Sequence, residues 1–156
     1  MNIQTYFHRE WRSPKIFLIL MAVAMPLSFS TWMALINNFA IERVNFTGVE
    51  IGILQSLREI PGFLAFAVVF LLLLIREQTL GLVSLLLLGI GTAITGAFPT
   101  VIGLYATTVL MSIGFHYYET VRQSIVLQWV SKESSPHFLG QLIAVGSFSG
   151  LLSFSL

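Results

Sequence analysis

The feature that most constrains this chain is a stretch from Thr79 to Tyr118 that contains no Asp, Glu, Lys or Arg. As a single helix rising about 1.5 Å per residue, it would be about 60 Å long, twice the thickness of a bilayer's hydrocarbon core. The stretch must therefore fold back. Pro99 is the natural breaking point, because proline lacks an amide proton and disfavours helical geometry in the residue before it.

Composition extends this interpretation to the whole chain. Of the 156 residues, 56% are hydrophobic and 10% are charged. Soluble domains carry about a quarter of charged residues, so a soluble fold is excluded. We predict an all-α membrane protein, a multi-pass helical bundle that follows a cytoplasmic segment 1–15. The predicted helices span about 16–36, 50–75, 79–98, 101–130 and 138–156, and the last one ends as if truncated.

The first apolar run, Ile16 to Ile36, follows basic residues and therefore also resembles a signal peptide. It is longer than the apolar core of a signal peptide, about 7 to 15 residues, so we expect it to be retained. Basic residues also indicate orientation, because they concentrate on the cytoplasmic side. We predict a cytoplasmic N-terminus in a bacterial inner membrane, with Tyr6, Phe7 and Trp11 as interfacial anchors. One side of the bundle would carry Arg9, Arg12, Lys15, Arg76 and Lys132, and the other side Arg43.

Several functional classes are excluded by what the sequence lacks. There are no cysteines and the net charge is +1, so thiol chemistry and a basic surface for nucleic acid are both absent. The string Gly146-Ser147-Phe148-Ser149-Gly150 places Phe148 where a nucleophile elbow needs serine. No phosphate-binding glycine loop occurs. We therefore expect no enzyme, no cofactor and no metal site.

Charged side chains at bilayer depth are costly, and they commonly face a cavity, a partner or a pathway. In the helix 50–75, Gln55, Arg58, Glu59 and Gly62 follow at positions i, i+3, i+4 and i+7, so they share a face. Pro61 can kink this helix by removing a backbone donor. Two interpretations stay open: an ion pair that fixes helix packing, and a role in a pathway.

The helix 101–130 carries a second polar face. His116, Glu119 and Gln123 follow at i, i+3 and i+7, with Arg122 one step around the helix. If Trp129 is the inner interfacial aromatic, Glu119 lies about 15 Å from it, near the midplane. A shallower position at the cytoplasmic end is the alternative. Histidine exchanges protons near neutral pH, so His116 beside Glu119 is a candidate proton relay, whereas a hydrogen bond to a neighbouring helix is the competing role.

Small residues indicate close helix contacts. Gly146 and Gly150 form a GxxxG spacing in the helix 138–156, where Ser147 and Ser149 offer hydrogen bonds between helices. We expect the glycines of the helix 79–98 to act in the same way; they are Gly89, Gly91 and Gly96.

Two segments, NNFAIERVNFTGVEIGILQSLREIPGFLAF and GFHYYETVRQSIVLQW, resemble transporters of the major facilitator superfamily, most of all a bacterial branch. The resemblance runs from about Ser13 onward and implies an alternating-access carrier with two six-helix halves, of which this chain holds the first five helices. The chain departs from the family pattern at Ile75-Arg76-Glu77-Gln78-Thr79, which keeps one arginine of a more basic loop. The resemblance implies cavity positions for Asn37, His116, Glu119 and Arg122, and a position near the gate for Arg58 and Glu59.

We therefore expect a secondary active transporter of a small solute, embedded in the lipid bilayer. Glu119 and His116 would couple protons, and Arg122, Gln123 and Asn37 would contact the substrate. The alternative is a small multi-pass membrane protein without transport activity, whose polar stripes hold helices together or bind a partner. Neither expectation involves a nucleic-acid partner.

Overall fold

A computed structural model describes residues 13–155, which are almost entirely helical and include no β-strand. The all-helical prediction is therefore confirmed for this part of the chain. The predicted basic residues Arg9 and Arg12 and the predicted anchors Tyr6, Phe7 and Trp11 lie outside the described residues. The α-helices are α2 (Pro14–Val44), α3 (Gly48–Phe63), α4 (Val68–Leu72), α5 (Glu77–Ile94), α6 (Val101–Trp129) and α7 (Ser135–Phe154). Two 3-10 helices join them, η1 (Leu64–Ala67) and η2 (Thr95–Ala97).

Four helical segments are long and apolar enough to cross a membrane. They are Pro14–Val44, Gly48–Leu72, Glu77–Ala97 and Ser135–Phe154. By length and composition, residues 13–155 therefore have the helices expected of a multi-pass membrane protein. The fifth long helix, α6, is continuous, but His116, Glu119 and Arg122 interrupt its apolar sequence. It packs against α2, α3, α5 and α7.

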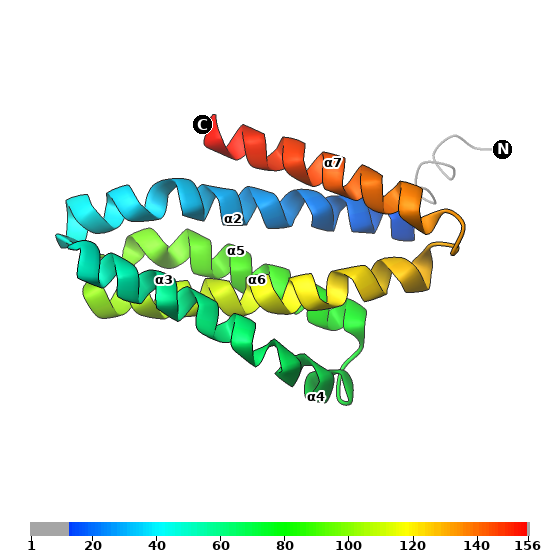
Figure 1. The fold of residues 1–156 in the computed structure, drawn as a ribbon, viewed down its shortest axis with the longest axis horizontal. Coiled ribbons are helices and arrows are strands. Elements are labelled where there is room, and N and C mark those ends of the chain that lie inside the picture. The colour runs from blue at the N-terminus through cyan, green and yellow to red at the C-terminus, as the bar shows by residue number, and fades with distance from the viewer. Residues whose placement is uncertain (1–12, 156) are drawn as a thin grey trace.

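The helices lie lengthwise beside one another, with α6 central (Figure 1). The most extensive contact joins α5 and α6, and α2 and α7 form a second pair. On the other side of α6, α3 packs against it, and α4 then lies at the edge of the bundle (Figure 1), where Val68 is still buried in the core. This arrangement leaves one face of α6 between α2 and α3.

Local capping explains where the helices begin. The Ser13 hydroxyl accepts a hydrogen bond from the Ile16 amide, and Thr100 does the same for Gly103 at the start of α6. Thr47 and Glu50 form a capping box at the start of α3, so that two otherwise unpaired amides are satisfied. Asn45 ends α2 in the left-handed conformation, with φ 58°, which asparagine tolerates better than most residues.

Several predicted helix ends need correction. α2 continues past residue 36 to Val44, because Ile36 and Ala40, one turn apart, are both buried against neighbouring helices. The predicted helix 50–75 corresponds to the single helical span Gly48–Leu72. Within it the α-helical geometry changes to the 3-10 helix η1 two residues after Pro61 and resumes in α4. α5 begins at Glu77 instead of the predicted residue 79, and α7 begins at Ser135 instead of the predicted residue 138.

Glycines allow the closest helix contacts, as predicted for Gly91, Gly146 and Gly150. Gly89 makes only an ordinary contact, since a Cβ atom there would lie 4.0 Å from Ser28 Oγ, and Gly114 was not predicted. A Cβ atom on Gly91 would lie 2.7 Å from the Met111 amide nitrogen, and one on Gly114 would overlap the backbone of Ser84 and Leu88, so α5 and α6 touch backbone to backbone. Gly146 and Gly150 likewise pack on α2, where the Ser149 hydroxyl donates to the Val23 carbonyl at 3.0 Å. Gly96, by contrast, borders open space.

Buried apolar side chains form two clusters, one toward each end of the bundle. Along α6, the first cluster includes Val121 and Ile125, and the second includes Leu104 and Met111. His116 and Glu119 lie between these two clusters. The polar residues of α6 therefore occupy the middle of the bundle rather than one end.

Candidate functional site

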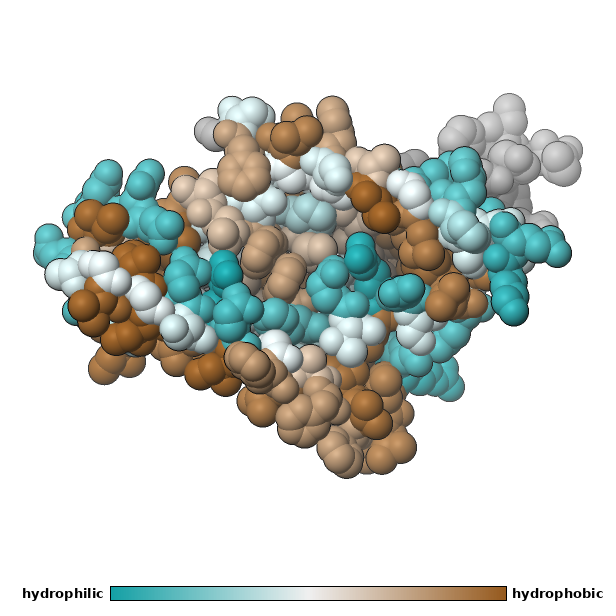
Figure 2. Space-filling view, viewed as in Figure 1, coloured by the Kyte–Doolittle hydropathy of each residue, from teal (hydrophilic) through white to brown (hydrophobic). Residues whose placement is uncertain are grey.

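The polar side chains of α6 lie on the face between α2 and α3. The opposite face packs on α5 through Gly114, Val121 and Ile125, which are buried. By the 3.6-residue period of the helix, His116 and Glu119 must then project away from α5. Figure 2 shows hydrophilic residues gathered in a band across the middle of this side of the molecule, flanked by apolar surface.

The first group of charges joins α3 to α6. The Arg58 Nη2 and Nε atoms donate to Oε1 of Glu59, at 2.6 and 2.9 Å. The second oxygen of Glu59, Oε2, lies 3.9 Å from Nε2 of His116. The third donor group of the guanidinium, Nη1, points to the Met33 sulfur of α2 at 3.0 Å. Side chains of α2, α3 and α6 thus meet around the ion pair of Arg58 and Glu59.

Two small residues hold this group in place. The Ser112 hydroxyl, one turn before His116, donates to the Arg58 carbonyl and ties α6 to α3. Gly62 leaves room for the imidazole ring, because a Cβ atom there would lie 2.8 Å from Cε1 of His116. Ser112 and Met33 were not predicted as site residues. The four-residue spacing from Ser112 to His116 was the available signal, and nothing in the sequence indicated Met33.

The second group lies one turn farther along α6. Arg122 Nη2 donates to Oε2 of Glu119 at 3.3 Å, which is long for a charge-assisted bond. The other carboxylate oxygen, Oε1, is buried without a hydrogen-bond partner among the described residues. A buried carboxylate oxygen without a donor is costly, so a hydrogen-bond donor from outside the described residues is expected at this oxygen.

The predicted pairing of His116 with Glu119 is not found. No ion pair within 4.0 Å joins them in the described chain, and His116 lies near Glu59 instead. The reason is that a three-residue spacing places two side chains on one side of a helix but does not direct them toward each other. The ring of His116 fills the space that Gly62 provides on α3.

Arg122 also borders a cavity of about 380 Å³ between α2, α6 and α7. Tyr118 lies beside it on α6, and Pro26 and Ser30 of α2 face Ser147 of α7. Tyr118 was not predicted as a site residue. Its buried aromatic character is indistinguishable in sequence from that of a core residue.

The remaining predicted site residues are Asn37, Gln55 and Gln123. Asn37 and Gln123 are exposed, and Gln55 is half-buried. Asn37 lies one turn after Met33, on the side of α2 that reaches Arg58. The structure gives none of the three a hydrogen bond to the charged groups.

Taken together, the site has two arginines, two carboxylates and one imidazole, distributed over α3 and α6. At 3.9 Å, one bridging water molecule would connect His116 to Glu59. The arrangement can therefore hold and exchange protons and present guanidinium groups to an anionic group. Comparisons with protein-family models, with curated proteins and with solved structures found no match.

Proposed function

We propose that this chain forms part of the solute pathway of a secondary active transporter of the major facilitator type. It would be a carrier rather than an enzyme, embedded in a bacterial inner membrane with its N-terminus in the cytoplasm. The observation that carries the proposal is the set of ionisable side chains of α3 and α6 at the middle of the bundle, on a face that the other described helices leave open. Such residues in membrane proteins characteristically mark ion and substrate pathways.

The solvent exposure of the Glu59 and Glu119 side chains distinguishes a role in a pathway from that of an ion pair that only fixes helix packing. A pair that only fixes helix packing is best shielded on all sides, because lipid cannot solvate a charge. Here the Glu59 side chain is 49% exposed and that of Glu119 is 34% exposed. Their charges therefore need either water or another protein surface in front of them, and a solute pathway supplies water.

The proposed coupling differs from the sequence-based expectation in one residue. His116 has Glu59, not Glu119, as its nearest carboxylate. We assign proton exchange to His116 and Glu59. Arg122, which lines the cavity of α2, α6 and α7, would contact the solute together with Glu119, its ion-pair partner.

Transport by the complete gene product tests this proposal. The protein is reconstituted in liposomes containing a pH-sensitive dye, and proton entry is recorded with a panel of small sugars, amino acids, organic acids and amines. We expect one class of solute to drive proton entry, Glu59→Gln to abolish that entry while solute exchange continues, and Glu119→Gln to weaken solute binding. Glu50→Gln, at the capping box outside the site, is the matched control. Unchanged proton-driven uptake in Glu59→Gln would rule out the coupling role.

A second function, a non-transporting protein that binds a partner in the membrane, is favoured by one observation. The segment from Phe63 to Leu74, which includes α4 at the edge of the bundle (Figure 1), exposes large apolar side chains on its outer side. A partner helix could cover this surface. In that case Phe70→Ser, which replaces a side chain that is 63% exposed on this surface, would change the particle size in detergent, and the protein would show no transport.

A further inference from the structure

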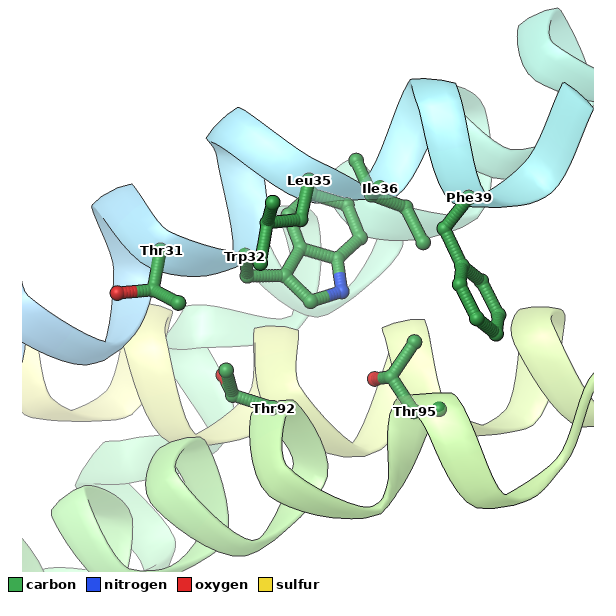
Figure 3. Close-up of a pocket in the computed structure, with 8 residues that line it drawn as sticks. Thr31, Trp32, Leu35, Ile36, Phe39, Thr92 and Thr95 are labelled. Carbon is green, nitrogen blue, oxygen red and sulfur yellow. The ribbon is translucent and has the colours of Figure 1, made fainter. Parts of the chain in front are cut away.

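A separate cavity lies between α2 and α5, on the side of α2 away from the charged face. Its volume is about 140 Å³. Figure 3 shows Trp32, Ile36 and Phe39 of α2 above it, facing Thr92 and Thr95. The residues of α2 that reach the charged site, such as Met33, do not line it.

The indole of Trp32 is the unusual group in this cavity. Trp32 is 2% exposed, and its Nε1 atom has no hydrogen-bond partner in the described chain. Figure 3 shows this nitrogen directed into the space above Thr92 and Thr95. Buried indole N–H groups usually find an acceptor, so an acceptor from outside the chain is expected here.

The threonines cannot supply a second free donor. The Thr31 and Thr95 hydroxyls donate to the carbonyls of Leu27 and Gly91, each at 2.7 Å. The Thr92 hydroxyl is directed to the Ser28 carbonyl of α2 at 3.5 Å. The cavity thus offers one free donor, no charge and an otherwise mainly apolar wall, which suits an uncharged oxygen acceptor on an apolar body.

The position of the cavity indicates where such a molecule comes from. Leu35 at its edge is 60% exposed on the outer surface of the bundle, which faces the bilayer. Gly96, also at the edge, lies next to Ala97, the last residue of the span Glu77–Ala97. The cavity is therefore near one membrane interface, the depth of lipid ester groups, where tryptophan is enriched.

We infer that this cavity binds an uncharged oxygen acceptor that enters from the bilayer, namely a phospholipid ester carbonyl or the hydroxyl of a small neutral amphiphile, through the N–H of Trp32. The inference requires only that the chain is embedded in a membrane. It does not depend on the proposed transport function, because none of the charged site residues lines this cavity.

The indole proton resonance of Trp32 tests the inference. The chain is placed in nanodiscs of diester or of diether phospholipid, which differ only in the ester carbonyls, and Trp32→Phe assigns the resonance. A lipid ester as ligand predicts a downfield position in diester that is lost in diether lipid. A small amphiphile predicts equal positions in both lipids and a downfield shift on adding butanol. Positions that are equal and insensitive to butanol would overturn the inference.

A pair of glycine variants provides the control for folding and for nonspecific lipid effects. A Cβ atom on Gly96 meets no atom within 4 Å, so Gly96→Leu extends into open space at the edge of the cavity. Gly140 of α7 is equally unobstructed but remote from the cavity. We expect Gly96→Leu to remove the ligand-dependent shift of Trp32 and Gly140→Leu to keep it. Equal shifts in both variants would contradict binding in this cavity.

Discussion

At the scale of the residue, the geometry around His116 depends on the absence of a side chain at Gly62 of α3. Gly62 has no side chain, and the imidazole occupies the space that a side chain would fill. Arg58 and Glu59 lie one turn before Gly62 on α3, so the carboxylate meets the ring from that helix. A single glycine therefore determines which carboxylate is the neighbour of the histidine.

Gly62→Ala is the most specific test of this geometry. The added methyl group would lie 2.8 Å from Cε1 of His116, so the ring must turn away from Glu59. Because the displaced atoms are the end of a flexible side chain, we expect the free energy of unfolding to change by about 1 kcal/mol or less. The pH dependence of transport should change instead.

Gly52→Ala is the control for Gly62→Ala, since it lies in the same helix and a Cβ atom there meets nothing within 4 Å. Both variants are compared by thermal unfolding in detergent and by pH profiles of uptake. If the two variants have the same pH profile as the unmodified protein, the contact between His116 and Glu59 has no role in coupling.

The sequence indicated which residues belong to the site better than it indicated which of their side chains are in contact. Helical spacing placed Arg58 and Glu59 on one face of α3, where they form an ion pair. It grouped Glu119 with His116 and Gln123 on α6, whereas the structure pairs Glu119 with Arg122. It could not indicate that His116 meets Glu59, because that contact depends on how α3 crosses α6. The sequence could not predict that the Met33 sulfur accepts a hydrogen bond from Arg58, because a methionine in an apolar run is indistinguishable from any core residue.

At the scale of the element, the bundle is held together by helices that approach through small residues. α5 and α6 meet at Gly91 and Gly114, and α2 and α7 meet at Gly146 and Gly150. In a membrane, lipid is as apolar as the side chains, so van der Waals packing and hydrogen bonds between helices replace the hydrophobic effect as the stabilising interactions. Close packing of α6 on α5 also fixes which face of α6 is left for the charged residues.

Gly114→Ala tests this packing. The methyl group would overlap the backbone of Ser84 and Leu88, which cannot move aside as a side chain can. We expect destabilisation of about 1–3 kcal/mol, the range for overpacked cores. Gly140→Ala, which meets nothing within 4 Å, should change stability little. Unfolding curves in detergent that coincide for the two variants would show that the helices are farther apart than described here.

Helix ends were harder to predict than helices. Pro99 marked a real break, and α6 begins at Val101 as expected. Asn37 and Asn38 suggested an end that α2 passes by, because burial of Ile36 and Ala40 outweighs the local preference of asparagine. Pro61 was expected to kink a continuous helix, and the chain instead changes to a 3-10 turn after Phe63.

At the scale of the whole molecule, the face seen in Figure 2 carries a polar band between apolar regions. Large apolar side chains are exposed on every long helix, as expected for a protein surrounded by lipid. The charged residues of α3 and α6 are gathered on one face instead of being scattered. We therefore propose that water reaches this face at the middle of the bundle, while the other surfaces contact lipid.

Cysteine accessibility tests that claim most directly, because the chain has no cysteine of its own. Glu119→Cys and Leu86→Cys are each treated in native membranes with a charged, membrane-impermeant thiol reagent. The Leu86 side chain is the more exposed of the two, at 62%, but it lies in the apolar middle of α5. We predict rapid modification at position 119 and none at position 86. Equal lack of reaction at both positions would contradict a water-filled pathway along α6.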